Sequence, residues 1–194
     1  MSDAAIGSRS AGQASRFALV PHPDFPSTAV DSIEVEARRG ANGRLDLEFH
    51  VAGAIEKVAW PEWQGVGFAD RLWEHSCFEA FVGTAEDPGY VEINFATSGG
   101  WAAYRFSDYR EGMTPIPDAL LGGGRTIGGA ALRVRRSVRV DALADAPVWR
   151  LGLSAIIEAT DGGKSYWALA HPPGKPDFHD AVCFAARLAA PTRT

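Results

Sequence analysis

The sequence predicts an all-β domain, an antiparallel β-sandwich of the jelly-roll or immunoglobulin-like kind with long loops. Three observations indicate this fold. Apolar and polar residues alternate over many short segments, turn-forming residues separate the segments, and no segment carries a sustained helical stripe of apolar residues. Strands without intervening helices bury their apolar faces most readily as two sheets packed face to face.

The segment 44–51, "RLDLEFHV", shows the alternation most clearly. It places Leu45, Leu47, Phe49 and Val51 on one face and polar side chains on the other. Similar patterns predict further strands at residues 32–37, 55–60, 76–83, 90–96, 101–106, 132–140, 148–157, 166–170 and 181–188. Two connections, 61–75 and 107–129, are too long for turns, and we interpret the glycine run Gly122 to Gly124 as part of a flexible loop.

Length and composition predict one domain. A chain of 194 residues with 46% hydrophobic residues is long enough to bury a single core. Residues 1–15 are small and polar, which predicts a disordered lead-in before a ligand-binding domain at residues 16–190.

Charge and cysteine content exclude other classes. The net charge of -5 argues against nucleic-acid binding. The chain shows neither a secretory leader nor a membrane-spanning segment, so we expect a cytoplasmic protein with no membrane partner. Cys77 and Cys183 are expected to be reduced and buried.

A polar row is predicted on consecutive strands. With "TSGG" as a four-residue connection, the hairpin of 90–96 and 101–106 places Ala96 opposite Trp101 and Glu92 opposite Arg105. Asn94 then shares the face of Glu92, and Glu79 joins this row from the preceding strand. Carboxylates, an amide and a guanidinium suit a hydroxyl-rich or anionic small molecule. The competing interpretation is an exposed cross-strand salt bridge.

Aromatic and charged residues crowd the neighbouring segments, and we interpret them as the walls and rim of a small-molecule site. Any one of these aromatic residues is better explained as part of the core, so the argument depends on their grouping. A proline-rich stretch, "HPPGKPDFH", adds a stiff loop that cannot pair as a strand. The wall and rim candidates are Trp73, His75, Trp101, Tyr109, Arg110, His171, Lys175 and His179.

Three blocks of the sequence, "RLWEHSCFEAFVG", "YVEINFATSGGWAAYRFSDYREGM" and "YWALAHPPGKPDFH", resemble the bacterial DOMON-like proteins, a group similar to the family-nine carbohydrate-binding modules. The resemblance implies a β-sandwich that holds a ligand on a concave face or edge, a sugar or a b-type haem in related groups. Glu79, Glu92, Asn94 and Arg105 lie in the part that matches best.

Three other chemistries remain open. Haem would use Met113 with His75, His171 or His179. Zinc would need His75, Cys77, His179 and Cys183 to converge. A small enzyme, or an enzyme accessory, would use the paired carboxylates of Glu79 and Glu92. We expect none of these cofactors. The sequence favours non-catalytic binding of a small polar ligand, a carbohydrate or sugar derivative.

Overall fold

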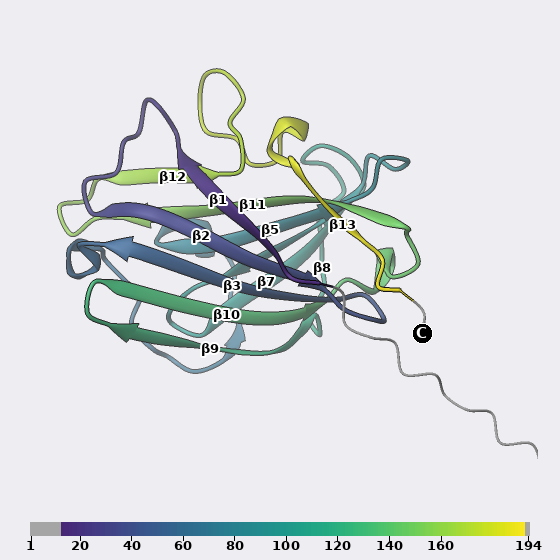
Figure 1. Ribbon diagram of the computed structural model, residues 1–194, viewed down its shortest axis with the longest axis horizontal. Coiled ribbons are helices and arrows are strands. Elements are labelled where there is room, and N and C mark those ends of the chain that lie inside the picture. Colours follow the sequence, from purple (N-terminus) through teal and green to yellow (C-terminus); the bar gives the residue numbers. More distant parts are fainter. Residues whose placement is uncertain (1–12, 193–194) are drawn as a thin grey trace, which may run out of the picture.

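The computed structural model describes residues 13–192, and this part of the chain is built almost entirely of β-strands joined by loops (Figure 1). The strands are β1 (Ser15–Pro21), β2 (Val30–Arg39), β3 (Arg44–Gly53), β4 (Gly67–Phe68), β5 (Cys77–Gly83), β6 (Tyr90–Phe95), β7 (Gly100–Phe106), β8 (Thr114–Pro115), β9 (Leu120–Gly128), β10 (Ala131–Arg139), β11 (Val148–Glu158), β12 (Lys164–Ala168) and β13 (Ala186–Ala189). Short 3₁₀ turns lie at η1 (Ile55–Lys57), η2 (Leu72–Glu74), η3 (Asp141–Leu143) and η4 (Ala181–Cys183).

The strands form one strongly curled, half-barrel sheet. Its order is β4-β7-β6-β5-β11-β12-β1-β2-β3-β10-β9, with β13 added beside β11 and β8 beside β7. β1 joins the two halves because it pairs with β12 at one end and with β2 at the other. The prediction of an all-β fold is confirmed. The separate sheets of a sandwich or jelly roll are not confirmed, and β4 runs parallel to β7 in an otherwise antiparallel sheet.

The curl brings the two halves of the sheet together around the main apolar core. Figure 1 shows β2, β3, β10 and β9 in front of β5 and β7. Phe49 in β3 contacts Phe78 in β5 and Phe95 in β6, with ring centroids 5.1 and 5.5 Å apart. All three rings are fully buried, and burying one such side chain stabilises a fold by about 1.5–3 kcal/mol.

The half built from β5, β6, β7, β11 and β12 is buried on its outer face as well. Phe78, Ala80 and Val82 of β5 point into the main core, as their spacing predicts. The outer face carries a second apolar cluster, made of Phe81, Tyr90, Ala102, Tyr104, Phe106, Ile156, Ala168 and Phe178. Loops cover this face, and every residue of β5 and β6 is buried as a result. Glu79, Glu92 and Asn94 of the predicted polar row lie on this covered face.

The hairpin register differs from the prediction by one residue. Glu92 lies opposite Tyr104 and Asn94 opposite Ala102, while Arg105 lies opposite Val91. The connection has three residues, because the Ala96 amide donates to the Gly100 carbonyl at 3.0 Å and Gly99 takes a positive φ of 91°. A slip of one residue moves every side chain to the other face. Arg105 is therefore on the face of the main core, at its exposed end.

Other boundaries also differ from the predictions. Residues 55–60 hold the turn η1 in place of a strand, and 181–188 begin with η4. The interpretation of 107–129 as one loop was wrong, since β8 and β9 lie within it. Gly123 shows why glycine is needed in β9: a Cβ there would lie 2.3 Å from the Arg135 carbonyl oxygen. Both cysteines are free and buried, as predicted.

The N-terminal boundary shifts slightly. Residues 1–12 of the predicted lead-in lie outside the described residues, and Ser15 already belongs to β1. Within residues 13–192, no helix has the length and apolar character needed to cross a membrane.

Candidate functional site

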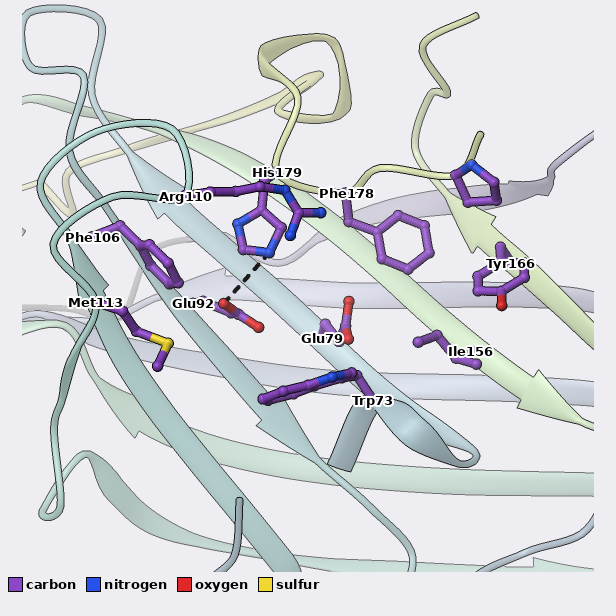
Figure 2. Close-up of a pocket in the computed structure, with 11 residues that line it drawn as sticks. Trp73, Glu79, Glu92, Phe106, Arg110, Met113, Ile156, Tyr166, Phe178 and His179 are labelled. Atoms are coloured by element: carbon purple, nitrogen blue, oxygen red, sulfur yellow. Dashed lines mark ion pairs between the residues drawn. The ribbon is translucent and has the colours of Figure 1, made fainter. Parts of the chain in front are cut away.

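A cavity of about 540 Å³ lies over the outer face of β5 and β6 (Figure 2). Strands supply its floor and two loops supply its rim: the β7–β8 loop, residues 107–113, and the proline-rich loop, residues 171–180. Its volume suits a small organic ligand. The lining residues are Trp73, Glu79, Glu92, Phe106, Arg110, Met113, Ile156, Tyr166, Pro176, Phe178 and His179.

The floor of the cavity contains two buried carboxylates. Glu79 is 3% exposed and Glu92 is 5% exposed. Ser154 donates a hydrogen bond to Glu79 at 2.9 Å, and the Asn94 amide donates to Glu92 at 2.6 Å. Within residues 13–192, neither carboxylate forms an ion pair with a lysine or arginine. The floor therefore holds two acidic groups whose only direct hydrogen-bond donors are neutral.

Burial controls the protonation of this pair. Desolvation, followed by repulsion from Glu92, raises the pKa of Glu79 to about 8. Desolvation also raises the pKa of Glu92, against the effects of the Asn94 hydrogen bond and the Arg110 charge. Glu79 is consequently protonated at neutral pH, and it presents an O–H donor to the cavity.

His179 forms the opposite wall, held by a hydrogen-bond chain. The Arg110 backbone N–H donates to the Tyr90 hydroxyl at 3.1 Å, and that hydroxyl lies 2.7 Å from His179 Nδ1. The Tyr90 hydroxyl donates a hydrogen bond to Nδ1, so the proton of the neutral imidazole ring is on Nε2. Nε2 lies 3.8 Å from the Glu92 carboxylate, across the cavity (Figure 2). Desolvation and the charge of Arg110 lower the pKa of His179 to about 4, so the ring is neutral.

Asp177 joins the two rim loops. It accepts hydrogen bonds from the Tyr109 hydroxyl and, at 2.8 Å, from the Arg110 guanidinium, both in the β7–β8 loop. It also accepts the backbone N–H of His179 at 3.1 Å. Burial alone raises the pKa of Asp177, but the hydrogen bonds from Tyr109 and Arg110 outweigh it and lower the pKa. The ionised Asp177 therefore holds Arg110 at the rim.

Seven of the twelve predicted site residues lie at or beside this cavity. Glu79, Glu92, Trp73, Arg110 and His179 line it. Asn94 supports Glu92 from the same face, and Tyr109 lies at the rim beside Asp177.

Five predicted residues lie elsewhere. His75 pairs with Glu158 at 2.8 Å, and Trp101 packs in the main core. Arg105 is on the opposite face of the sheet because of the register shift. His171 hydrogen-bonds the Val20 carbonyl at 2.9 Å and packs against His22, and Lys175 is exposed. None of these five lines the cavity.

Sequence reasoning missed several lining residues. The predicted pairing of Glu92 with Arg105 puts Phe106 on the face opposite Glu92, whereas the observed three-residue connection puts it on the face of Glu92. Phe178 lies within the proline-rich loop and reaches the cavity only when the loop is folded, while Tyr166 of β12 reaches it by pairing opposite Ile156 of β11.

The set proposed for zinc does not come together. His75 and His179 hydrogen-bond to Glu158 and Tyr90 respectively, and Cys183 donates to the Ala170 carbonyl at 3.1 Å. Across residues 13–192, no group of three or more His, Cys, Asp or Glu side chains is arranged to hold a metal ion.

These features define a class: an all-β domain with a ligand-sized, partly acidic cavity on one face of a curled sheet. Two solved structures share the fold. One is a Bacteroides uniformis protein with a provisional assignment as carbohydrate-binding (TM-score 0.61, 16% identity, 92% of this chain and 86% of that chain). The other is a family 9 carbohydrate-binding module from Caldicellulosiruptor kristjanssonii in complex with glucose (TM-score 0.50, 10% identity, 87% and 81%). No protein-family model and no curated protein matches the sequence.

Proposed function

We propose that this protein binds a small carbohydrate or sugar derivative in the cavity over β5 and β6, without catalysing a reaction on it. The observation that carries the proposal is the buried row of Glu79, Glu92 and Asn94 at the floor of an aromatic-walled cavity. Such a row offers both donors and acceptors, which hydroxyl groups of a sugar need at the same time.

Trp73 supplies the second element of a sugar site. Its indole lies beside the two carboxylates at the cavity wall, and it is 37% exposed (Figure 2). A flat aromatic face next to hydrogen-bonding groups suits the apolar face of a pyranose ring. Two proteins that share the fold also carry descriptions that refer to carbohydrate, and one of them contains glucose. These descriptions agree with the chemistry of the cavity.

We also infer that the chain is a cytoplasmic DOMON-like protein. The three sequence blocks that resemble this group contain Trp73, Glu79, Glu92 and His179, all of which line the cavity. The resemblance and the cavity thus refer to the same part of the fold.

Calorimetry with glucose, galactose and cello-oligosaccharides tests the proposal. We expect saturable binding with one sugar per chain, and Trp73→Ala is expected to weaken it about tenfold or more because the stacking surface is lost. Trp63→Ala is the matched control, since Trp63 is 55% exposed and does not line the cavity. Absence of binding by any sugar to the folded protein, or equal losses in both variants, would contradict the proposal.

A b-type haem is the second candidate, because Met113 and His179 both line the cavity. His75 and His171, the other histidines considered for this role, do not. A haem would also have to lie against two buried carboxylates, which favour polar or cationic ligands. An absorption spectrum after haem addition distinguishes the candidates: a Soret band that Met113→Ala alters would favour haem over sugar.

Catalysis is less well supported than binding. The paired carboxylates of Glu79 and Glu92 are the only groups in the lining that resemble an acid and base pair on a sugar. His179 approaches Glu92 at 3.8 Å and is engaged by Tyr90, so no histidine among the described residues is hydrogen-bonded to Glu79.

A further inference from the structure

The cavity floor contains more acidic than basic side chains. Glu79 and Glu92 are both buried there, and the nearest guanidinium is that of Arg110. Arg110 already forms an ion pair with Asp177 at 2.8 Å, and the charges of these two rim residues offset each other. His179 is neutral. Two carboxyl groups therefore share a cavity in which no cation from residues 13–192 is free to compensate them.

The walls of the same cavity favour a positive charge. Trp73, Phe106, Tyr166 and Phe178 line it, and Figure 2 shows Trp73 on one side of the carboxylates and Phe178 on the other. Aromatic faces carry negative electrostatic potential and attract ammonium groups, more strongly where water is excluded. Buried carboxylates and aromatic rings together form a surround that is typical of sites for organic cations.

We propose that the sugar bound in this cavity carries a protonated amino group, which lies between Glu79 and Glu92 while the ring packs against Trp73. The proposal rests on the proposed function, since it names the chemical class of the same ligand. With a neutral sugar bound, Glu79 keeps the proton that relieves its repulsion with Glu92. An ammonium group takes the place of that proton, because it allows Glu79 to ionise and forms charge-assisted hydrogen bonds to both carboxylates.

The groups around Glu79 decide what binding does to its proton. They are Glu92 from β6, Ser154 from β11, Arg110 from the rim and the Cys77 thiol from its own strand. Burial also raises the pKa of Cys77, which is neutral, so Glu92 and Arg110 are the charged neighbours. An ammonium group beside Glu79 stabilises its ionised form. Binding of an amino sugar at a pH where Glu79 is protonated is therefore expected to release a proton to the solvent.

Calorimetry with four probes tests this inference: glucosamine, N-acetylglucosamine, glucose and cyclohexylamine. The measurements are made at pH 6.5, where amines are protonated, in two buffers of different ionisation enthalpy. We expect glucosamine to bind about tenfold or more tightly than glucose or N-acetylglucosamine, as charge-assisted hydrogen bonds permit. We also expect proton release with glucosamine and none with glucose.

Glu79→Gln completes the test, because glutamine resembles the protonated side chain in size and polarity. This variant is expected to lose the preference for glucosamine and the proton release. Glu48→Gln, on an exposed strand face, is the control and should keep both. Equal affinities for glucosamine and glucose, or tight glucosamine binding without proton release, would overturn the inference and leave the proposed function standing. If cyclohexylamine bound as tightly as glucosamine, the amino group alone would explain binding, and the proposal that the ligand is a sugar would be contradicted.

Discussion

Two polar rows in this protein have similar sequence patterns and opposite properties. On β3, Asp46 and Glu48 alternate with core residues, as Glu79 does on β5 and Glu92 on β6. The β3 row is accessible to solvent and compensated: Arg38 pairs with Asp46 at 3.0 Å and Arg135 with Glu48 at 3.0 Å. The row on β5 and β6 is covered by loops, and its hydrogen-bond donors are a serine and an amide.

The pKa values of Asp46 and Glu79 are shifted in opposite directions as a result. Burial alone raises the pKa of Asp46, but hydrogen bonds from Ser137 and Arg44 outweigh it and lower the pKa. Burial raises the pKa of Glu79 to about 8, and Glu92 adds to the shift. Alternation along a strand therefore identifies an acidic row. Ion-pair partners and covering loops then decide whether its carboxyl groups have lowered pKa values at the surface or raised pKa values in a buried site.

The largest expected effect is a pH-dependent loss of stability that belongs to the buried row. Unfolded Glu79 releases its proton near its ordinary pKa of 4.5 and folded Glu79 only near 8, so stability falls as pH rises between these values. His179 acts oppositely between its ordinary pKa of 6.5 and about 4. Above pH 6.5 His179 contributes no further change, and Glu79 costs on the order of 2 kcal/mol by pH 8.

Urea unfolding of the wild type and of Glu79→Gln at pH 6.5 and 8 measures this effect. The variant is expected to lose far less stability over the interval, because glutamine does not titrate. Glu48→Gln, from the exposed row, should follow the wild type. An identical decline in all three proteins would show that the two rows do not differ in the way described.

A smaller effect is expected from the hydrogen-bond chain behind the cavity. Tyr90→Phe leaves the Arg110 N–H and His179 Nδ1 without the hydroxyl that both contact. Tyr90 is 4% exposed, so we expect a loss of about 1–2 kcal/mol in the free energy of unfolding. Tyr109→Phe, on the exposed rim, serves as the comparison and should cost clearly less. Similar losses in both variants would count against a buried chain.

The smallest effect is expected from the compensated row itself. Arg135→Gln removes an ion pair whose arginine is mostly exposed, and we expect less than about 0.5 kcal/mol in the free energy of unfolding. The difference should disappear at high salt, where exposed charges are screened. Ligand affinity should remain unchanged. Weaker sugar binding in this variant would mean that the ligand lies on the β3 face.

The sequence predicted the floor of the site better than its walls. Glu79, Glu92 and Asn94 were found because alternation along a strand decides which side chains share a face. Arg105 was placed wrongly because a hairpin register depends on one residue of the turn, and the positive φ of Gly99 is not determined by local composition. Phe178 reaches the cavity through the path of a long loop, which no strand pattern encodes, and Tyr166 reaches it because β12 pairs with β11, opposite Ile156.

The fold, like the site, was predicted only in part. Most strands follow from alternation, but β9 was read as a loop because three consecutive glycines lie within it. At Gly123, a close approach between β9 and β10, seen only in three dimensions, is what requires glycine. The continuity of the sheet could not be predicted either, since it depends on β1 pairing with two strands that are distant from each other in the sequence.

That double pairing of β1 has a consequence for how the chain reaches its native state. Val20 pairs with Ala168, so one edge of β1 stays open until β12 near the other end of the chain has emerged from the ribosome. The hairpin of β2 and β3 can form early and hold β1 by its first edge. Closure of the curl must then wait for a very long-range contact, which is typical of slow folding steps. We therefore expect the last step of folding to be the one that completes the wall of the cavity at Tyr166, next to that seam.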